Sequence, residues 1–568
     1  MRIFIPLFAS CFILATSIVA QNGNRILIDG SFQDWTDNSD LVSTYEDATG
    51  DGGLLDILQV QVANDADYLF IHLEVSAEID LSDNSTIEAE IQLFLDSDND
   101  PSTGLSINGI GAEYLLDFRD RRVIKYNSNS DYDIISFYDI GYAHLPTVTS
   151  EEFEIMLDRI FANQVVVGNT VSFYFKEDIG GDETEVITYT LGNDMDAFVP
   201  ISMERPDMDH FRLMTYNTLQ DGLLDNNQIN PLVRKIVAMN PDILHLNEVY
   251  DTPSNYVKNL LEDELGGTWY VHKYNGENMV ASRYPFLEIH EVYYGRLGAA
   301  LIDLPDNETD KDLLAVVGHL SCCSQDFNRQ EQVDALIEFL ADAKSPGGSI
   351  ELEEGTPILF SGDMNLVGND DQYNTIIDGN IFNNFVFGPD TKPDWNDQNF
   401  VDYRPLQVMK PNGITWNTSY PDPGDYPPGR LDFVFYGSSA LQPRNGFVLD
   451  TRDLSDDQLS EYTLLQSDSY FASDHLPLIT DFSVKTSTRT EQVGLWNLEV
   501  YPNPAHAMVQ VNSTLDWDTV EIFDLSGQLI QLERMMDNVF DVSEMTEGMY
   551  LLRFQRDNQI GHAKLIVH

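Results

Sequence analysis

The sequence predicts a multidomain protein in which an all-β sandwich precedes a mixed α/β region and a small all-β unit. Three observations predict this order. Apolar and polar residues alternate over strand lengths in residues 25–205, helix-like and strand-like segments mix in residues 208–485, and short alternating segments return in residues 494–568. At roughly 100–200 residues per domain, a chain of 568 residues accommodates these three units.

The chain is strongly acidic. It has 94 acidic and 31 basic side chains, which give a net charge of −63. Binding to nucleic acid through phosphate neutralisation needs clustered Lys and Arg, so this composition excludes that mode of binding. A hydrophobic fraction of 42% supplies packed cores and argues against wholesale disorder.

The first 20 residues have the pattern of a signal peptide. Arg2 precedes the apolar run Ile3–Ala20 and polar Gln21 follows, so we expect cleavage near Ala20. An uncleaved membrane anchor is the alternative. No later sequence segment has about 18 consecutive apolar residues. We therefore expect no stable membrane insertion of the mature chain, which would be secreted or held at the cell surface.

Residues 25–205 have the strand pattern of a β-sandwich. Strand-like segments at Asp56–Val62, Tyr68–Val75 and Thr86–Leu95 are separated by clusters of Gly, Asp and Asn. Turns at such intervals are typical of two packed antiparallel sheets. Trp35 either stacks on a sugar or fills the core. Ca²⁺ could bind three carboxylates at alternate positions, although a solvated acidic turn has the same pattern: Asp96, Asp98 and Asp100.

Two segments of this region carry a family resemblance. IDGSFQDW (28–35) and FLDSDND (94–100) together resemble the family 9-type carbohydrate-binding modules and their relatives. The resemblance implies a β-sandwich with a glycan or surface ligand.

Strands of the α/β region, residues 208–485, end repeatedly in polar or ionisable residues. The apolar run 211–214 leads to Asn217, and the run 358–360 leads to Asp363. One such ending is ordinary, because carboxylates and amides cap turns and helices. A set of them fits a shared site at one edge of a sheet. The candidate residues are Asn217, Glu248, His319, Asp363, Asn365, Asp432, Asp474 and His475.

These residue types suit hydrolysis of a phosphate ester. Glu248 and Asn217, with Asp474 as a further candidate, offer oxygen ligands of the kind that Mg²⁺ or Mn²⁺ prefers. His319 and His475 can donate protons to phosphate oxygens. Substrate charge is then handled by a metal and by imidazolium groups, so a basic surface is unnecessary.

Four further residues complete this chemistry. Asp432 or Asp474 can fix the tautomer of His475 and raise its pKa. Asp363 can orient or deprotonate a water molecule, and Asn365 can hydrogen-bond the transition-state oxygens. Two arginines of the region, Arg283 and Arg430, are candidates for neutralising phosphate charge.

At these residues the sequence resembles the endonuclease/exonuclease/phosphatase superfamily, which includes deoxyribonuclease I-like nucleases, sphingomyelinases and inositol-phosphate phosphatases. The resemblance implies a four-layer α/β sandwich with its site at one edge of the paired sheets. Two positions depart from the usual motifs: Asn247 replaces a Gln and Asn278 replaces a Gly. The matching segments, in order, are MTYNTL (214–219), PDILHLNEV (241–249), NMVASRYP (278–285), VVGHLS (316–321), SGDMNL (361–366), RLDFVF (430–435) and SDHLPL (473–478).

Two adjacent cysteines, Cys322 and Cys323, closely follow His319. They form either a vicinal disulfide or two small side chains, since the predicted export places them in an oxidising compartment. A cysteine nucleophile activated by His319 is a rival to the phosphoesterase interpretation. We expect instead that the pair shapes the loop after His319.

The C-terminal unit resembles the sorting domain of the type IX secretion system. The segments that carry the resemblance are LEVYPNP (498–504), VEIFDLSGQ (520–528), GMYLL (548–552) and KLIV (564–567). The resemblance implies export from a Gram-negative bacterium through the type IX machinery, with no catalytic role for this unit.

The sequence thus favours a secreted, metal-dependent phosphoesterase that acts as a nuclease or small-substrate phosphodiesterase. A phosphomonoesterase or sphingomyelinase-like enzyme is one alternative. A carbohydrate- or surface-binding protein with an inactive middle domain is another.

Overall fold

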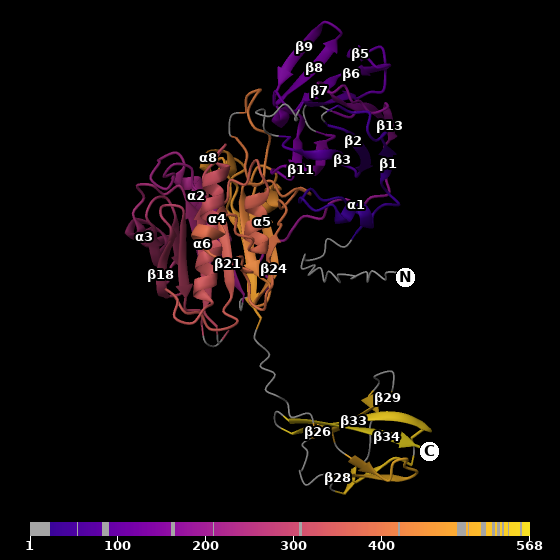
Figure 1. Cartoon of the computed structure of the whole chain (residues 1–568), viewed down its shortest axis with the longest axis vertical. Coiled ribbons are helices and arrows are strands. Elements are labelled where there is room, and N and C mark those ends of the chain that lie inside the picture. Colours follow the sequence, from indigo (N-terminus) through magenta and orange to yellow (C-terminus); the bar gives the residue numbers. More distant parts are fainter. Residues whose placement is uncertain are drawn as a thin grey trace, which may run out of the picture. The chain divides into compact units, whose positions relative to one another are not determined.

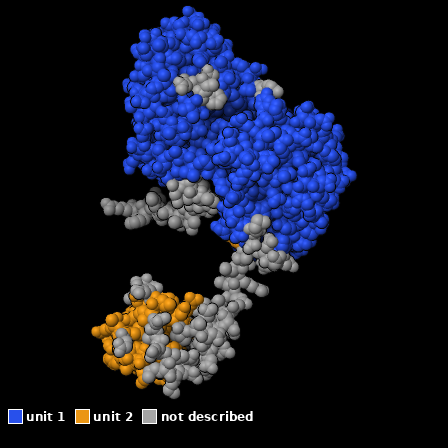
Figure 2. All heavy atoms as spheres, turned by 180° about the vertical axis from the view of Figure 1, so that it is seen from behind, with its two compact units in different colours: residues 1–484 blue, residues 485–568 orange. Residues whose placement is uncertain are grey.

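The computed structural model divides the chain into two compact units, residues 1–484 and 485–568 (Figure 2). The predicted signal peptide lies outside the described residues. Those residues are 23–485 without 54, 82–89, 161–164, 208–209, 306–308, 310 and 419–420, and 496–568 without 498, 513–518, 525–528, 531–533, 537–538, 544 and 557–558.

The first unit begins with the predicted all-β sandwich (Figure 1). One sheet has the strand order β1 (Ser43–Glu46), β2 (Ile57–Asn64), β3 (Tyr68–Ile79), β11 (Ser150–Asp158) and β10 (Tyr142–Leu145). The other has the order β13 (Ile187–Thr190), β12 (Thr170–Glu177), β4 (Ile91–Asp96), β7 (Tyr114–Asp117), β8 (Arg122–Ser128) and β9 (Asp131–Ile135). Alternate apolar residues of the strands, such as Leu69, Ile71 and Leu73 on β3, meet in one core. Outside the sheets lie α1 (Gln33–Asp37), the 3₁₀ helix η2 (Phe137–Ile140) and the hairpin β5 (Leu105–Ile107) and β6 (Ile110–Ala112).

Two six-stranded sheets form the centre of the α/β region. The first has the order β16 (Tyr270–Lys273), β17 (Met279–Ser282), β15 (Ile243–Asn247), β14 (Phe211–Asn217), β25 (Leu478–Val484) and β24 (Leu441–Val448). The second has the order β18 (Phe286–Tyr293), β19 (Leu297–Ile302), β20 (Leu313–His319), β21 (Ile358–Asp363), β23 (Asp432–Gly437) and β22 (Phe400–Tyr403). The pairs β14–β15 and β20–β21 are parallel, and the other pairs are antiparallel.

Helices cover the outer faces of these sheets and complete the predicted four layers. One apolar core, which includes Leu213 of β14 and Val317 of β20, lies between the sheets. A second core joins the first sheet to α2 (Ile229–Met239), α3 (Ser254–Leu265), α7 (Asp456–Tyr462) and α8 (Asp468–Ala472). On the other face, α4 (Asp326–Ala343) and α5 (Asp371–Asp378) pack on the second sheet, with α6 (Asn384–Phe387) beside them.

The predicted helices form for local reasons. Apolar residues at helical spacing, such as Leu232, Ile236 and Met239, give α2 one buried face. The helix ends at Asn240, which has a left-handed φ of 46° and is followed by Pro241, which cannot continue the hydrogen-bond ladder.

The sandwich and the α/β region are joined by backbone pairing. Ile28 and Asn412 form a parallel bridge, and Val148 pairs with Gly368 in the same way. Asp80 accepts a hydrogen bond from the Gly368 amide at 3.2 Å. The two regions therefore belong to one compact unit.

The second unit is the predicted small all-β fold. One sheet has the order β26 (Trp496–Asn497), β34 (Gln559–Val567), β33 (Gly548–Arg556), β29 (Thr519–Asp524) and β30 (Leu529–Ile530). The other has the order β27 (Glu499–Tyr501), β28 (Met508–Asn512), β32 (Val539–Asp541) and β31 (Arg534–Met536). Residues such as Val509, Leu552 and Leu565 share its core. Among the described residues of the whole chain, no helix combines the length and apolar character needed to cross a membrane.

Candidate active site

The predicted site residues meet at one edge of the two central sheets. Asn217 ends β14, His319 ends β20 and Asp363 ends β21. Asp432 begins β23, which runs antiparallel to β21. Asp432 therefore lies opposite Asp363 in the strand pairing. His475 lies three residues before β25. Opposite strand directions thus bring chain segments far apart in sequence to the same edge.

The centre of the site is one carboxylate oxygen of Asp363. The Nε2 atom of His319 lies 3.4 Å from Asp363 Oδ2, and the Nε2 atom of His475 lies 3.5 Å from the same oxygen. Asn217 Nδ2 donates to this oxygen at 2.9 Å and to Glu248 Oε1 at 3.0 Å. All of these residues except Glu248 are buried, so their charges interact in a medium less polar than water.

His475 is held by a second carboxylate. Its Nδ1 atom lies 2.7 Å from Asp432 Oδ2. Burial alone would lower the pKa of His475, but Asp432 and Asp363 outweigh this effect and raise it to about 10. Burial raises the pKa of Asp432 to about 6. At neutral pH the pair is therefore an imidazolium and a carboxylate.

His319 has a carboxylate partner that is not among the predicted site residues, Glu277. His319 Nδ1 lies 3.4 Å from Glu277 Oε1. Burial opposes ionisation of Glu277, but His319, Tyr250 and Arg296 outweigh it and lower its pKa to about 2. Burial would likewise lower the pKa of His319, yet Asp363 and Glu277 raise it.

Glu277 could not be predicted as a site residue, because it does not follow the end of a strand-like segment. It lies two residues before β17, in a loop whose sequence shows no periodicity. The only available signal is that it immediately precedes the segment NMVASRYP, which carries the family resemblance.

The other predicted residues have supporting or peripheral positions. The Asn365 amide N–H donates to Asp363 Oδ1 at 3.0 Å, and its side chain donates to the Leu320 carbonyl at 3.1 Å. The backbone carbonyl of Asp474 accepts a hydrogen bond from the Asn417 amide at 2.8 Å. The Ser473 hydroxyl lies 3.4 Å from the Asp474 carboxylate.

The two departures from the family motifs contact each other. Asn247 Nδ2 donates to Asn278 Oδ1 at 2.8 Å and to the Gly318 carbonyl at 2.9 Å. Asn247 Oδ1 accepts from the Asp363 amide at 3.0 Å, and Asn278 donates to the Arg296 carbonyl at 2.6 Å. This buried amide pair thus connects β15 with β20 and β21 directly beneath the site.

The arginines considered from sequence lie away from the site. Arg430 is buried in a two-point ion pair with Asp402, with contacts of 2.8 and 2.6 Å. Arg283 stacks over Trp269, 4.7 Å from the ring centre. The guanidinium group that does reach the site is that of Arg296, which pairs with Glu277.

The donor set fits a divalent cation. Glu248, His319 and Asp363 each offer a ligand atom, and these atoms lie within 4.8 Å of one another. Asn217 touches two of the three residues, whereas Asp474 is outside this group. The carboxylate oxygens of Glu248 and Asp363 suit a hard ion such as Mg²⁺. Asn217 directs its Nδ2 atom at both carboxylates, and its Oδ1 atom accepts from the Leu219 amide at 3.0 Å. The site has more carboxylates than cationic groups, which leaves negative charge for a metal to offset. The five carboxylates are those of Glu248, Glu277, Asp363, Asp432 and Asp474. The three groups that can be cationic are His319, His475 and Arg296.

The cysteine pair is adjacent to the site. Both thiols are free and exposed, with their Sγ atoms 2.6 Å apart. Partial burial of the sulfur and the neighbouring thiol raise the pKa of Cys322 to about 11. The raised pKa disfavours the thiolate that a nucleophile requires, which argues against Cys322 as the nucleophile.

In the sandwich, the three predicted calcium ligands do not all lie in one group. Asp96, Asp98 and Glu113 form a close group, whereas Asp100 accepts hydrogen bonds from the backbone and hydroxyl of Ser102 at 2.9 and 2.6 Å. Calcium binding there stays a prediction. Trp35 is buried, and its indole N–H donates to Glu154 at 3.3 Å, so it belongs to the core and is not a sugar platform.

Comparison with known proteins agrees with this geometry. The model of the Endonuclease/Exonuclease/phosphatase family matches residues 214–475, and that of the secretion system C-terminal sorting domain matches residues 499–568. The chain therefore contains a region of the endonuclease/exonuclease/phosphatase type at residues 214–475. Its sorting domain directs export through the type IX secretion system. Neither model covers the N-terminal sandwich, so its resemblance to carbohydrate-binding modules stays a prediction.

The solved structures that match this chain cover about half of it. The human Nocturnin catalytic domain with bound sulfate is 18% identical, with 49% of this chain and 95% of that chain covered and a TM-score of 0.32. TDP2 from Caenorhabditis elegans is 15% identical, with 48% and 74% covered and a TM-score of 0.33. Sphingomyelinase C from Streptomyces griseocarneus is 14% identical, with 48% and 99% covered and a TM-score of 0.29. No curated protein sequence shows significant similarity to the chain.

Proposed function

We propose that this chain is a secreted, metal-dependent phosphoesterase that hydrolyses phosphodiester bonds. One observation carries the proposal: two buried histidines, each backed by its own carboxylate, direct their Nε2 atoms at the same oxygen of Asp363. This arrangement supports a mechanism in which two proton donors and one proton acceptor surround a bound phosphate.

The pKa directions support a division of roles. Neighbouring carboxylates raise the pKa of His475 to about 10, so its ring is an imidazolium group at neutral pH and acts as a donor. Asp363 and Glu277 also raise the pKa of His319, which favours the same protonated form. The acceptor is then the Asp363 carboxylate, which takes a proton from water as the water oxygen bonds to phosphorus. The bond from phosphorus to the leaving oxygen breaks, and His475 donates the proton that this oxygen gains. His319 and Asn365 hydrogen-bond the remaining phosphate oxygens.

Mg²⁺ or Mn²⁺ would be held by Glu248 and Asn217 and, when bound, would supply charge neutralisation of the phosphate. Glu248 is already oriented for such a role. Its other carboxylate oxygen accepts a hydrogen bond from the Gln220 amide at 2.8 Å, and its backbone has a left-handed φ of 59°. Non-glycine residues adopt this conformation uncommonly, because Cβ crowds the backbone.

The net charge of the domain indicates which class of phosphate ester it favours as substrate. Residues 208–485 contain 17 basic and 44 acidic residues, so the domain carries a net charge of −27. Such a surface disfavours long duplex DNA and leaves small or single-site phosphodiesters as the preferred class. Phosphomonoesters and sphingomyelin are the alternatives that a substrate panel must include.

The test is hydrolysis of bis-p-nitrophenyl phosphate by the full chain. EDTA should abolish activity and added Mg²⁺ or Mn²⁺ should restore it, while His475→Ala should lose activity with its fold intact. The matched control is His290→Ala, because His290 also pairs with a carboxylate, Glu288 at 2.9 Å, but lies on β18 outside the site. Full activity in EDTA, or in His475→Ala, would refute the proposal.

A binding protein with an inactive middle domain makes the opposite prediction. It would show no hydrolysis of DNA, RNA, sphingomyelin or phosphomonoesters under any metal condition. The complete set of paired histidines and carboxylates disfavours this alternative, because loss of function usually removes at least one such group.

A further inference from the structure

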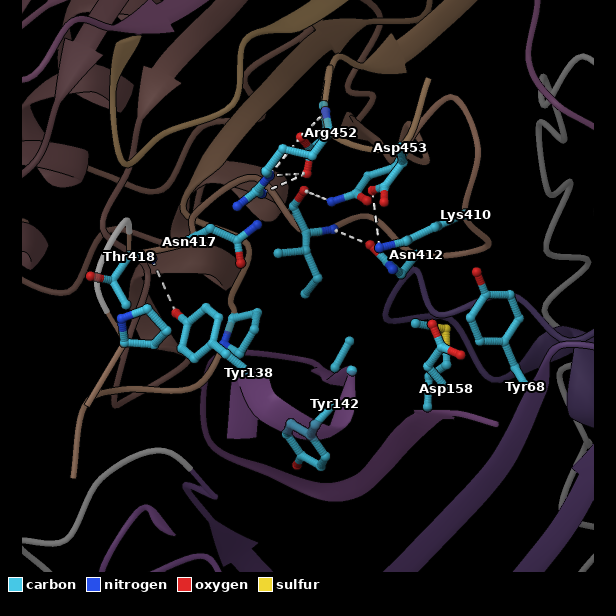
Figure 3. Close-up of a pocket in the computed structure, with 18 of the residues that line it drawn as sticks. Tyr68, Tyr138, Tyr142, Asp158, Lys410, Asn412, Asn417, Thr418, Arg452 and Asp453 are labelled. Carbon is cyan, nitrogen blue, oxygen red and sulfur yellow. Dashed lines mark hydrogen bonds and ion pairs between the residues drawn. The ribbon is translucent and has the colours of Figure 1, made fainter. Parts of the chain in front are cut away.

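A pocket of about 330 Å³ lies between the sandwich and the α/β region within the first unit (Figure 3). The sandwich contributes Tyr68, Tyr138 and Asp158 to its lining. The α/β region contributes Lys410, Asn417 and Arg452. In Figure 3 these side chains surround an open space from opposite sides. Pockets that bind small molecules begin at roughly this volume, about 300 Å³.

The pocket borders the catalytic loop. Asn417, which lines it, donates its backbone N–H to the Asp474 carbonyl at 2.8 Å. The preceding residue, Trp416, forms an antiparallel bridge with His475. Tyr470, another lining residue, lies on α8, which leads directly into Asp474 and His475. One wall of the pocket is therefore formed by the segments that hold the catalytic histidine.

The sandwich also forms hydrogen bonds with the segment that follows Asn417. The Tyr138 hydroxyl accepts a hydrogen bond from the Thr418 amide at 3.2 Å and donates one to the Tyr426 carbonyl at 3.2 Å. The Arg121 guanidinium stacks over the Tyr426 ring at 4.0 Å. The two walls of the pocket are thus bonded to each other.

The charges of the lining decide which ligand it suits. Lys410 pairs with Asp453 at 3.0 Å and Arg452 pairs with Asp450 at 2.5 Å, so neither cation is available to neutralise a phosphate alone. Asp158 adds a third carboxylate. A lining with aromatic rings, amides and no net positive charge repels a second phosphate. It favours hydroxyl groups, which donate to carboxylates and accept from amides.

We propose that this pocket binds a neutral, polyhydroxylated ring attached to the scissile phosphate, and so selects the substrate. The proposal rests on the proposed phosphodiesterase function. The ring could be the sugar of a nucleotide or a cyclitol, since both present hydroxyl groups around an apolar face. The sandwich then acts as part of the enzyme and supplies half of the substrate site.

The test compares three chromogenic substrates: the p-nitrophenyl phosphodiesters of a nucleoside and of inositol, and bis-p-nitrophenyl phosphate, which has no such ring. The double variant Tyr68→Phe with Asn417→Ala removes one hydroxyl and one amide from the lining. It should lower kcat/KM about thirtyfold through KM for whichever ring substrate the pocket accepts, because two hydrogen bonds of about 1 kcal/mol each are lost. It should leave bis-p-nitrophenyl phosphate hydrolysis unchanged.

The matched control is Tyr132→Phe, an exposed tyrosine on β9 of the same sandwich and outside the pocket lining. An unchanged KM for both ring substrates, or an equal loss on all three substrates, would overturn the pocket assignment. If the chain hydrolyses no phosphodiester at all, saturation-transfer NMR of the full chain with a nucleoside and with inositol decides the matter separately. Contact signals that the double variant loses would support the pocket, and absence of signals from the unaltered chain would refute it.

Discussion

Replacement of Asp432 by Asn tests the role assigned to the buried pair at the site. Asp432 is fully buried and lies 2.7 Å from His475 Nδ1. Asn has the same shape but no charge, so the variant removes the electrostatic support of the imidazolium while it largely preserves packing. We expect slower hydrolysis and an alkaline limit of activity at lower pH.

The magnitude follows from the pKa of His475. Its rise from 6.5 to about 10 corresponds to a preference of about 5 kcal/mol for the imidazolium. Asp432 and Asp363 share this effect, and Asp432 makes the shorter contact, 2.7 against 3.5 Å. We assign about 3 kcal/mol to Asp432, which corresponds to about a hundredfold in kcat and about two pH units in the alkaline limit.

The sign of the pH effect is set by the protonated form. Activity that needs the imidazolium is present below the pKa of His475 and is lost as pH rises through about 10. Loss of Asp432 lowers that pKa, so the decline moves to lower pH.

The assay is steady-state hydrolysis of bis-p-nitrophenyl phosphate from pH 5 to pH 11 with saturating metal. Asp394→Asn is the control, because Asp394 is also a buried carboxylate of this domain, but it caps Trp395 and Ser439 beyond the opposite end of β23. A folded Asp432→Asn enzyme with unchanged kcat and an unchanged alkaline limit would show that the pair has no part in proton transfer.

Three further predictions concern other parts of the chain. Glu277→Gln should lower kcat about tenfold or more in the same assay, because His319 loses the carboxylate at its Nδ1 atom. Asp481→Ala should lower the free energy of unfolding in urea by about 3–5 kcal/mol, because it leaves Arg212 buried without a two-point partner at 2.7 Å. Deletion of residues 499–568 should leave the protein inside the cell envelope, which cell fractionation measures, because the sorting domain is lost.

Each of these predictions has a comparison that can contradict it. Glu288→Gln removes a carboxylate from a histidine outside the site and should not alter kcat, so an equal effect of both variants would argue against a specific role for Glu277. Asp178→Ala breaks the exposed pair with Lys176 and should cost less than about 1 kcal/mol, so an equal cost would refute the burial argument. Export of the truncated chain at normal levels would contradict the assignment of the sorting domain.

The sequence was informative where chemistry follows local pattern. Strand ends marked Asn217, His319 and Asp363, and all three meet at one sheet edge as expected, because strands of the two sheets end together there. Helical spacing over residues 230–239 and a stop at Asn240-Pro241 also predict a helix, since periodicity and a following proline are local signals, and the structure has α2 at Ile229–Met239.

Contacts between residues that are distant in the sequence could not be predicted from local pattern. Glu277 reaches His319 from a loop without pattern, and Arg296 reaches Glu277 from the turn before β19. The attachment of the sandwich to residues 411–430 depends on tertiary packing that no periodicity encodes. Arg430 was a reasonable candidate for phosphate binding, but only the structure shows that Asp402 holds it.

The amide pair beneath the site has a consequence for mutagenesis, because its two positions should act together. Asn247 is one methylene shorter than the Gln usual at its position, and Asn278 brings a side chain where Gly would have none. Asn247→Gln alone would crowd the longer side chain against Asn278. Asn278→Gly alone would leave one of the two Asn247 amide hydrogens without its acceptor, while the Gly318 carbonyl still accepts the other. The two effects should therefore not add, and the double variant should cost less stability than the sum of the single variants.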